Sequence, residues 1–376
     1  MTSTSYPGVW LPGDEPGRRQ FAVIADRGGA GVPLEAGGRL AEVTVAYETW
    51  GELNQSRTNA VLVLHALTGD SHAAGPPGVG HPSAGWWEGL IGPGAAIDTD
   101  RYHVVCPNVL GGCQGTTGPA SLGSDGSPYG SRFPLITIRD QVAVEVALAD
   151  QLGIERWACI IGGSMGGMRV LEWCVGQPER VARAVVLAVG AAASADQIAL
   201  CSLQIRSIRS DPAFQGGDYY GTSRRPVDGL SIARGMGQFG YRTGDEFRRR
   251  FDREAQGEEE PLKGGRYAIE SYLQHQGEKL AHRFDPNSYV TLSEAMNHHD
   301  VGRGRGGVGQ ALRRVQAETR VAGIVTDRLY PLAQQEELVR HLPGNPPLGV
   351  IESESGHDGF LLEVEQVGAI VESALS

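Results

Sequence analysis

The sequence predicts an α/β fold, with a mostly parallel central sheet flanked by helices and an inserted helical lid. Over residues 1–190, short apolar runs alternate with helical patterns, which is typical of a parallel sheet covered by helices. From 191 to 319 the strand-like runs stop, and polar helical segments and loops rich in Gly and Arg follow. Strand-like runs return at Val321–Val325 and Leu348–Ile351. We therefore expect a core domain from residues 1–190 and 320–376, and a helical lid domain over 191–319.

Four apolar runs in the first half read as strands, and they are Ala60–Leu64, Tyr102–Val105, Trp157–Ile161 and Ala184–Val189. Between the second and third, Thr137–Asp140 has the pattern of a capping box, which begins a helix. That helix is expected to continue to Leu152, with one apolar face made of Val142, Val146 and Ala149.

The third of these runs leads into a G-x-S-x-G motif within Ile160–Gly167, with Ser164 at its centre. A helical pattern follows directly, with Met168, Leu171 and Cys174 on one side. A strand that turns sharply into a helix at such a motif exposes the serine hydroxyl, and the flanking glycines allow the tight packing of the turn. Ser164 is therefore a candidate nucleophile for acyl transfer.

A serine nucleophile needs a base and a carboxylate that orients the base. Asp327 comes just after the strand-like run Val321–Val325, and His357 comes in a loop after the last run. The chain order of serine, acid and histidine is the order found in α/β-hydrolases. We therefore predict a catalytic triad of Ser164, Asp327 and His357.

The negative charge that develops on the acyl oxygen needs backbone N–H donors. One is usually the amide after the nucleophile, here Met165, and the other comes from the loop after an earlier strand. That loop is His65–Gly69, and we choose Leu67 as its donor. The predicted oxyanion hole therefore consists of the backbone amides of Leu67 and Met165.

Composition excludes several classes of protein. The formal net charge of −11 disfavours nonspecific binding to nucleic acid, and no run of eighteen apolar residues predicts a membrane span. Met1–Pro16 is polar and lacks the apolar segment of a signal peptide. The scattered cysteines form no C-x-x-C pair, which favours reduced thiols. We expect a cytoplasmic protein with no membrane partner and no nucleic-acid partner.

Three other patterns carry less weight. His298–Asp300 could suggest a metal site, but no carboxylate or cysteine cluster accompanies it. Gly302–Gly307 matches a dinucleotide-binding fingerprint by letter, yet no strand precedes it. Cys113 has no evident base, so a packing role is favoured over a reactive thiol. We expect no metal and no permanently bound cofactor.

Longer motifs make the chain resemble the homoserine O-acetyltransferase family of the α/β-hydrolase superfamily. They recur in family order from about residue 40 onward, as His65–His72, Asn108–Pro119, Gly162–Met168, Ala233–Arg242 and Gly356–Phe360. The resemblance implies a two-step reaction in which acetyl-CoA, a co-substrate, acetylates Ser164. The hydroxyl of L-homoserine then takes the acetyl group, with His357 as base, and O-acetyl-L-homoserine is formed for methionine biosynthesis.

The resemblance also assigns binding residues. Arg234 matches the family arginine that binds the homoserine carboxylate, and Asp358 matches the residue that binds the ammonium. Tyr241 is a plausible neighbour of the substrate hydroxyl. A guanidinium fork fits a carboxylate, and a carboxylate fits an ammonium, so this pair suits an amino acid. In the family, lid helices also pair two subunits, so a homodimer is expected.

Alternative activities stay open at this point. The same elbow and triad fit a homoserine O-succinyltransferase or an acyltransferase that acts on serine or another alcohol. They also fit a hydrolase of esters or thioesters, in which Arg234 and Asp358 would have no evident purpose. Structural roles for both are the simpler alternative, a lid ion pair for Arg234 and a loop cap for Asp358.

Overall fold

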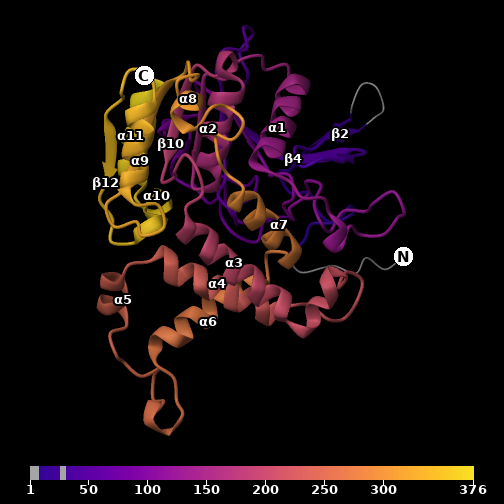
Figure 1. The fold of residues 1–376 in the computed structure, drawn as a ribbon, viewed down its shortest axis with the longest axis vertical. Helices are drawn as coiled ribbons and strands as arrows, with labels where there is room; N and C mark the ends of the chain where they lie inside the picture. The colour runs from indigo at the N-terminus through magenta and orange to yellow at the C-terminus, as the bar shows by residue number, and fades with distance from the viewer. Residues whose placement is uncertain (1–7, 26–30) are drawn as a thin grey trace.

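A mostly parallel sheet of eight strands forms the centre of the molecule (Figure 1). The computed structural model describes residues 8–25 and 31–376, so the first seven residues of the N-terminal segment, where we expect no signal peptide, lie outside the description. In spatial order the strands are β1 (Gln20–Ile24), β4 (Val43–Trp50), β8 (His103–Pro107), β5 (Ala60–Leu64), β9 (Cys159–Gly163), β10 (Arg183–Leu187), β11 (Glu318–Ile324) and β12 (Leu348–Ile351). The predicted mostly parallel sheet is confirmed.

The antiparallel part of the sheet lies at one edge. Strand β4 pairs antiparallel with both β1 and β8, whereas β8, β5, β9, β10, β11 and β12 pair in parallel. Sequence reasoning identified neither β1 nor β4. Two further pairs of two-residue strands lie outside the main sheet, β2 (Val32–Pro33) with β3 (Arg39–Leu40) and β6 (Ile91–Gly92) with β7 (Ile97–Asp98).

Helices cover both faces of the sheet, and the strand residues alternate between them. In β5, Leu62 and Leu64 belong to the apolar cluster that includes α1 (Ile138–Leu152) and α2 (Met165–Gly176). The intervening Val61 and Val63 belong to the cluster on the opposite face, with α11 (Val364–Leu375). Helix α9 (Leu332–His341) packs beside β11 and β12, and its Leu338 lies in the first cluster.

The capping box at the start of α1 is confirmed. The Thr137 side chain accepts from the Asp140 backbone N–H, and the Asp140 carboxylate accepts from the Thr137 N–H at 2.8 Å. The apolar face of this helix was only partly predicted, because Val146 is half-buried whereas Glu145 is buried. The burial of Glu145 has its cause in a partner on α2, described below.

A helical block interrupts the core between β10 and β11. It contains α3 (Ala195–Ser210), α4 (Val227–Tyr241), α5 (Gly244–Arg250), α6 (Ala268–Ala281) and α7 (Pro286–Asn297). In Figure 1, α3 to α6 form the lower layer, whereas the short α8 (Val308–Leu312) lies back among the core helices. The division into a core and a lid over 191–319 remains a prediction.

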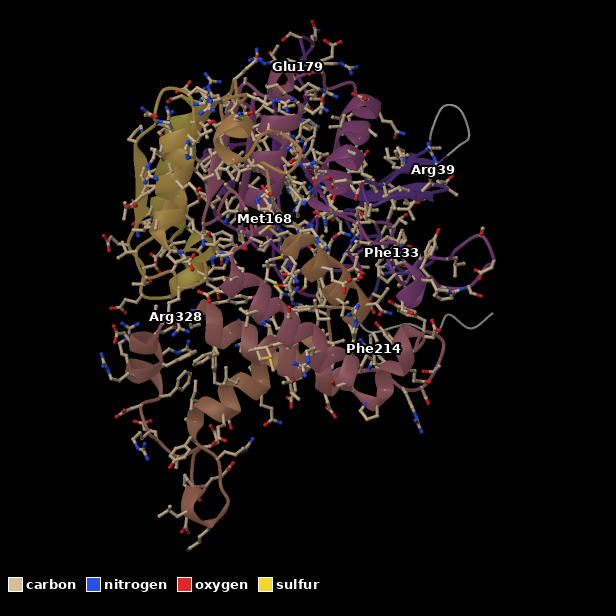
Figure 2. The ribbon with its side chains drawn as sticks, in the orientation of Figure 1. Arg39, Phe133, Met168, Glu179, Phe214 and Arg328 are labelled. Carbon is tan, nitrogen blue, oxygen red and sulfur yellow. The ribbon has the colours of Figure 1, made fainter. Side chains whose placement is uncertain are left out.

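The two ends of the helical block meet at the sheet. Ala192 and Asp300 form an isolated bridge, and the Val301 N–H donates to the Ala191 carbonyl at 3.0 Å. Farther along, Arg328, in the loop after β11, donates to the Phe239 carbonyl of α4 at 2.6 Å. Figure 2 shows Arg328 at this junction between the upper body and the lower layer.

The cysteines lie in the interior of the protein. All five cysteines are buried and none is paired in a disulfide, in agreement with the prediction of free thiols. Burial raises the pKa of the Cys113 thiol, so it stays protonated, which fits a packing role. Within the described residues, no helix combines the length and the apolarity needed to cross a membrane.

Candidate active site

Ser164 lies in the sharp turn between β9 and α2. Its φ of 56° and ψ of −126° are unusual for a residue with a side chain, so the turn is strained. The turn also needs glycines: a Cβ on Gly162 would lie 2.6 Å from the carbonyl carbon of Gly166 and 3.0 Å from the Leu64 oxygen. The predicted strand-turn-helix arrangement is therefore present, and it aims the serine hydroxyl toward the loops at the carboxyl ends of the strands.

Two of those loops bring His357 and Asp327 to the serine. His357 Nε2 lies 2.9 Å from Ser164 Oγ, and His357 Nδ1 lies 2.7 Å from Asp327 Oδ2. All three residues are buried. The structure thus joins in one hydrogen-bonded chain three side chains that follow β9, β11 and β12, an arrangement able to remove the proton from the serine hydroxyl.

The carboxylate of Asp327 is itself held in place. Its Oδ1 accepts hydrogen bonds from the backbone N–H groups of Leu329 at 2.8 Å and Tyr330 at 2.9 Å. The other oxygen is then left to accept from His357 Nδ1, which fixes the tautomer with a free lone pair on Nε2. This tautomer is the one that a general base for Ser164 requires.

Aromatic rings surround the imidazole of His357. Tyr330 stacks on it with ring centroids 5.0 Å apart, and Phe360 meets it edge-on at 5.4 Å. Burial lowers the pKa of His357, but the Asp327 carboxylate, its hydrogen bond and the charge of Asp358 outweigh burial, so the pKa is raised above 6.5. The imidazolium form is thus stabilised by its neighbours.

A small cavity of about 160 Å³ opens above Ser164 and His357. Its walls come from the loop after β5, the helical block and the loop around His357. The lining residues are Ala66, Leu67, Thr68, Gly69, Trp86, Ser164, Arg234, Tyr241, Arg283, Met296, Leu329, His357, Asp358, Phe360 and Leu361. The cavity therefore lies between the strand ends and the helical block, where a substrate would reach the serine.

The two predicted oxyanion donors belong to segments next to the nucleophile, the first turn of α2 and the loop after β5. Met165 is the first residue of α2, so its N–H has no acceptor within the helix. Leu67 lines the cavity, and no described residue accepts a hydrogen bond from its N–H. Both amides are thus available to a ligand oxygen, which is what an oxyanion hole requires.

The predicted binding residues also reach the cavity. Arg234 extends from α4, forms no ion pair with any described residue, and its Cζ lies 5.7 Å from the Tyr241 ring centroid. The Tyr241 ring lies 5.8 Å from that of His357. Asp358 lines the cavity too, but Arg242 Nε lies 3.0 Å from its Oδ2. An unpaired guanidinium and a partly engaged carboxylate thus face the same space.

Arg283 is a cavity residue that sequence reasoning missed. Its Nη1 donates to the Thr68 carbonyl at 2.8 Å, and burial together with the charge of Arg234 lowers its pKa. Two guanidinium groups near one another favour an anionic ligand. No local motif marks Arg283, because it lies in the loop between α6 and α7 and contacts Thr68, a residue far away in the sequence.

Among the described residues, Glu48, His72 and His81 form a buried group whose possible ligand atoms lie within 4.8 Å of one another, close enough to hold a metal ion. Two of the imidazole nitrogens in this group already form hydrogen bonds. His72 Nδ1 bonds Glu48 at 2.9 Å, and His81 Nε2 accepts from the Arg18 N–H at 3.1 Å. The cluster therefore reads as a hydrogen-bonded support of the loop after β5. His299, in the discounted histidine pair, bonds the Gly190 carbonyl at 3.1 Å.

Comparisons with known proteins agree with this geometry. The family described as alpha/beta hydrolase fold matches residues 59–364. A homoserine O-acetyltransferase from Thermobifida fusca is 59% identical over 370 residues, which cover 98% of this chain and 97% of the relative. One from Mycolicibacterium smegmatis is 56% identical and covers 91% of this chain and 90% of the relative.

Solved structures with the same fold include enzymes of two kinds. A homoserine O-acetyltransferase from Bacillus anthracis has a TM-score of 0.86 and 27% identity, covering 95% of this chain and 97% of that one. An acetylester hydrolase from Corynebacterium glutamicum has a TM-score of 0.79 and 27% identity, covering 96% of each chain. The architecture alone therefore does not separate transfer from hydrolysis.

The charge of Asp327 should set the ionisation of His357. Because the folded-state pKa of His357 is raised, this histidine stabilises the fold below pH 6.5, and its contribution is lost as pH rises through the folded value. We expect Asp327→Asn to lower the pKa of His357, measured by NMR titration of the imidazole. Glu352→Gln, which removes an exposed carboxylate near the same loop, serves as control. An unchanged pKa in Asp327→Asn would contradict this electrostatic account.

Proposed function

The chain belongs to the homoserine O-acetyltransferase family of α/β-hydrolase proteins, and we propose that it transfers acetyl from acetyl-CoA to the hydroxyl of L-homoserine. The observation that carries the proposal is the chain from Ser164 through His357 to Asp327 beneath a cavity with an unpaired Arg234. The product, O-acetyl-L-homoserine, would serve methionine biosynthesis. No metal or permanently bound cofactor enters this scheme, because acetyl-CoA acts as a co-substrate.

The first half-reaction acetylates the enzyme. Ser164 Oγ attacks the thioester carbonyl while His357 Nε2 takes its proton, and Asp327 stabilises the resulting imidazolium. The amides of Leu67 and Met165 bind the oxyanion of the tetrahedral intermediate. That intermediate collapses as the C–S bond breaks, and His357 returns the proton to the leaving CoA thiolate.

The second half-reaction repeats these roles with homoserine. Its hydroxyl loses a proton to His357 Nε2 and attacks the acetyl carbon of acetyl-Ser164. The ester bond to Ser164 then breaks, and Ser164 Oγ recovers the proton. Arg234 would bind the substrate carboxylate and Asp358 the ammonium, with Tyr241 beside the hydroxyl. Holding both ends of the amino acid places its hydroxyl against the acyl group, which is a proximity effect.

The ion pair with Arg242 adds a detail to the role of Asp358. Arg242 also contacts Glu246 at 3.1 Å, so it anchors the end of α4 to the loop of His357. With Oδ2 of Asp358 held by Arg242 Nε, its Oδ1 is the atom left for an ammonium group. The ammonium site would thus be preset by the same contact that joins the helical block to the catalytic loop.

Acylation by acetyl-CoA alone tests the proposal. We expect intact-mass spectrometry to find one acetyl group on the wild-type protein, located on Ser164, and homoserine to remove it as O-acetyl-homoserine. Ser164→Ala should keep its fold and gain no acetyl group. Release of free acetate at the same rate with and without homoserine would instead identify a hydrolase. Faster acylation by succinyl-CoA would favour the succinyl donor, for which Arg283 offers a second guanidinium in the cavity.

The carboxylate site gives a second test. Arg234→Gln should raise the homoserine KM roughly 10- to 100-fold, because a hydrogen bond to a charged group contributes about 1.5–3 kcal/mol. Acetylation of Ser164 by acetyl-CoA should change little, since homoserine is absent from that step. Arg224→Gln removes an exposed arginine before the same helix and is the matched control. An unchanged homoserine KM in Arg234→Gln would count against the assignment.

A homodimer through the helical block is also part of the proposal. Ile232 and Phe239 on α4 are 56% and 59% exposed, and with Met236 and Leu273 they border an apolar groove between α4 and α6. A continuous apolar surface of this kind favours a protein partner. Free, buried thiols are compatible with the proposed cytoplasmic location.

Charge introduced into this groove should separate the subunits. We expect the wild-type protein to sediment as a dimer and Ile232→Asp as a monomer in analytical ultracentrifugation, because burying a carboxylate in an apolar interface is costly. Val79→Asp is the control, since Val79 is 72% exposed and lies far from α4 in the sequence. A monomeric wild-type protein, or a dimer that tolerates Ile232→Asp, would contradict an interface in this groove.

A further inference from the structure

The helix that begins at the nucleophile carries a fully buried charge that the reaction scheme does not use. Arg169, on α2, has an exposed fraction of 0%, and its Nη1 lies 2.7 Å from Glu145 Oε1 on α1. Trp173 Nε1 donates to the other oxygen of Glu145 at 2.8 Å. A buried ion pair is often no more stabilising than apolar residues of similar volume, so stability alone does not explain it.

The second amino group of Arg169 leads to the oxyanion loop. Arg169 Nη2 donates to the backbone carbonyl of His65, the first residue after β5. That carbonyl belongs to the peptide unit directly before the unit that contains the Leu67 amide. Arg169 therefore connects the helix that carries Ser164 and Met165 to the loop that carries Leu67.

The ring of His65 fixes the next peptide unit. The Val109 N–H donates to His65 Nε2 at 3.1 Å, so the proton is on Nδ1, which donates to the Ala66 carbonyl at 2.8 Å. Burial and the charge of Arg169 lower the pKa of His65 to about 3, which keeps the ring neutral in this tautomer. The Gly69 N–H also donates to the Ala66 carbonyl, at 3.0 Å.

Holding the Ala66 carbonyl also aims the Leu67 amide. In a planar trans peptide the C=O of one residue and the N–H of the next point in opposite directions. Two donors on the Ala66 oxygen therefore turn the Leu67 N–H the other way. Gly69 and His65 are in close contact in this conformation of the loop. A Cβ added to Gly69 would lie only 2.8 Å from the His65 Cβ.

We propose that Arg169, held by Glu145, is a positioning residue that sets the oxyanion loop at a constant distance from the nucleophile. Through His65, Arg169 orients the Leu67 N–H. Helix α2 carries both Arg169 and Met165, so the positions of both N–H donors depend on this one helix. Arg169 touches no reacting atom. The inference rests on the proposed use of Ser164 and Leu67, and it applies to any acyl donor that the serine attacks.

A double variant separates positioning from stability. Arg169→Met with Glu145→Gln removes both charges and leaves an amide oxygen to accept from Trp173. Replacing a buried pair together avoids the unpaired charge that makes single changes costly. The matched control is Arg305→Met with Glu172→Gln, which removes a pair farther along α2 whose Arg305 Nη1 and Glu172 Oε2 lie 2.8 Å apart.

The readouts are thermal unfolding, turnover of p-nitrophenyl acetate and the KM for homoserine. Removing one oxyanion donor lowers kcat by about 10²–10³-fold. A donor that is present but misaligned should therefore lower the kcat for p-nitrophenyl acetate about tenfold or more. We expect this loss in the double variant, with an unfolding midpoint near that of the wild type and a homoserine KM within about twofold. The control pair should retain wild-type kcat.

Wild-type kcat in a folded double variant would overturn the proposal, as would an equal loss in the control pair. If the double variant does not fold, Arg169→Lys decides, because one ammonium can pair with Glu145 but cannot also span to His65. Its kcat should fall with KM unchanged, and a wild-type kcat would refute positioning. The ester assay needs neither CoA nor homoserine, so a wild-type protein that fails to acetylate homoserine but hydrolyses the ester would refute only the proposed function.

Discussion

The site depends on one backbone constraint, the strained turn with positive φ at Ser164. Positive φ at a residue with a side chain is costly, and the turn persists because the glycines around it let β5, β9 and α2 approach closely. That close approach places the serine hydroxyl beside the loops that follow β11 and β12. His357 and Asp327 follow two of these strands, and parallel strands end at the same edge of the sheet. Both side chains therefore lie close to Ser164 without any rearrangement of the fold.

Electrostatics in this region follow from burial combined with specific partners. Burial disfavours charge on both His357 and His65, yet the two histidines differ because Asp327 faces one and Arg169 faces the other. One imidazole is thereby suited to accept a proton, and the other is held neutral as a hydrogen-bonding strut. The same residue type thus serves two purposes in two loops that line one cavity, and the neighbouring charge decides which.

Local patterns in the sequence were sufficient for the parallel strands and for the residues that follow them. The bounds of β5 and β12 match the prediction, and Ser164, Asp327 and His357 each follow a strand in the order expected. Contacts between distant segments were beyond such patterns. Glu145 was not part of the predicted apolar face, and its burial depends on Arg169 of a neighbouring helix. The place of Arg283 in the cavity and the ion pair of Asp358 with Arg242 could not be predicted either, because both depend on contacts between distant segments.

The helical block leaves and re-enters the core at adjacent points, joined by the Ala192–Asp300 bridge and the bond from Val301 to Ala191. Because the two junctions are neighbours, closing this long excursion costs little more than closing a short one. Evolution can therefore lengthen, shorten or exchange the intervening helices without disturbing the sheet or the proton-transfer machinery below it. Replacement of the helical block alone would in this way give the same core a new substrate preference, or change the reaction from acyl transfer to hydrolysis.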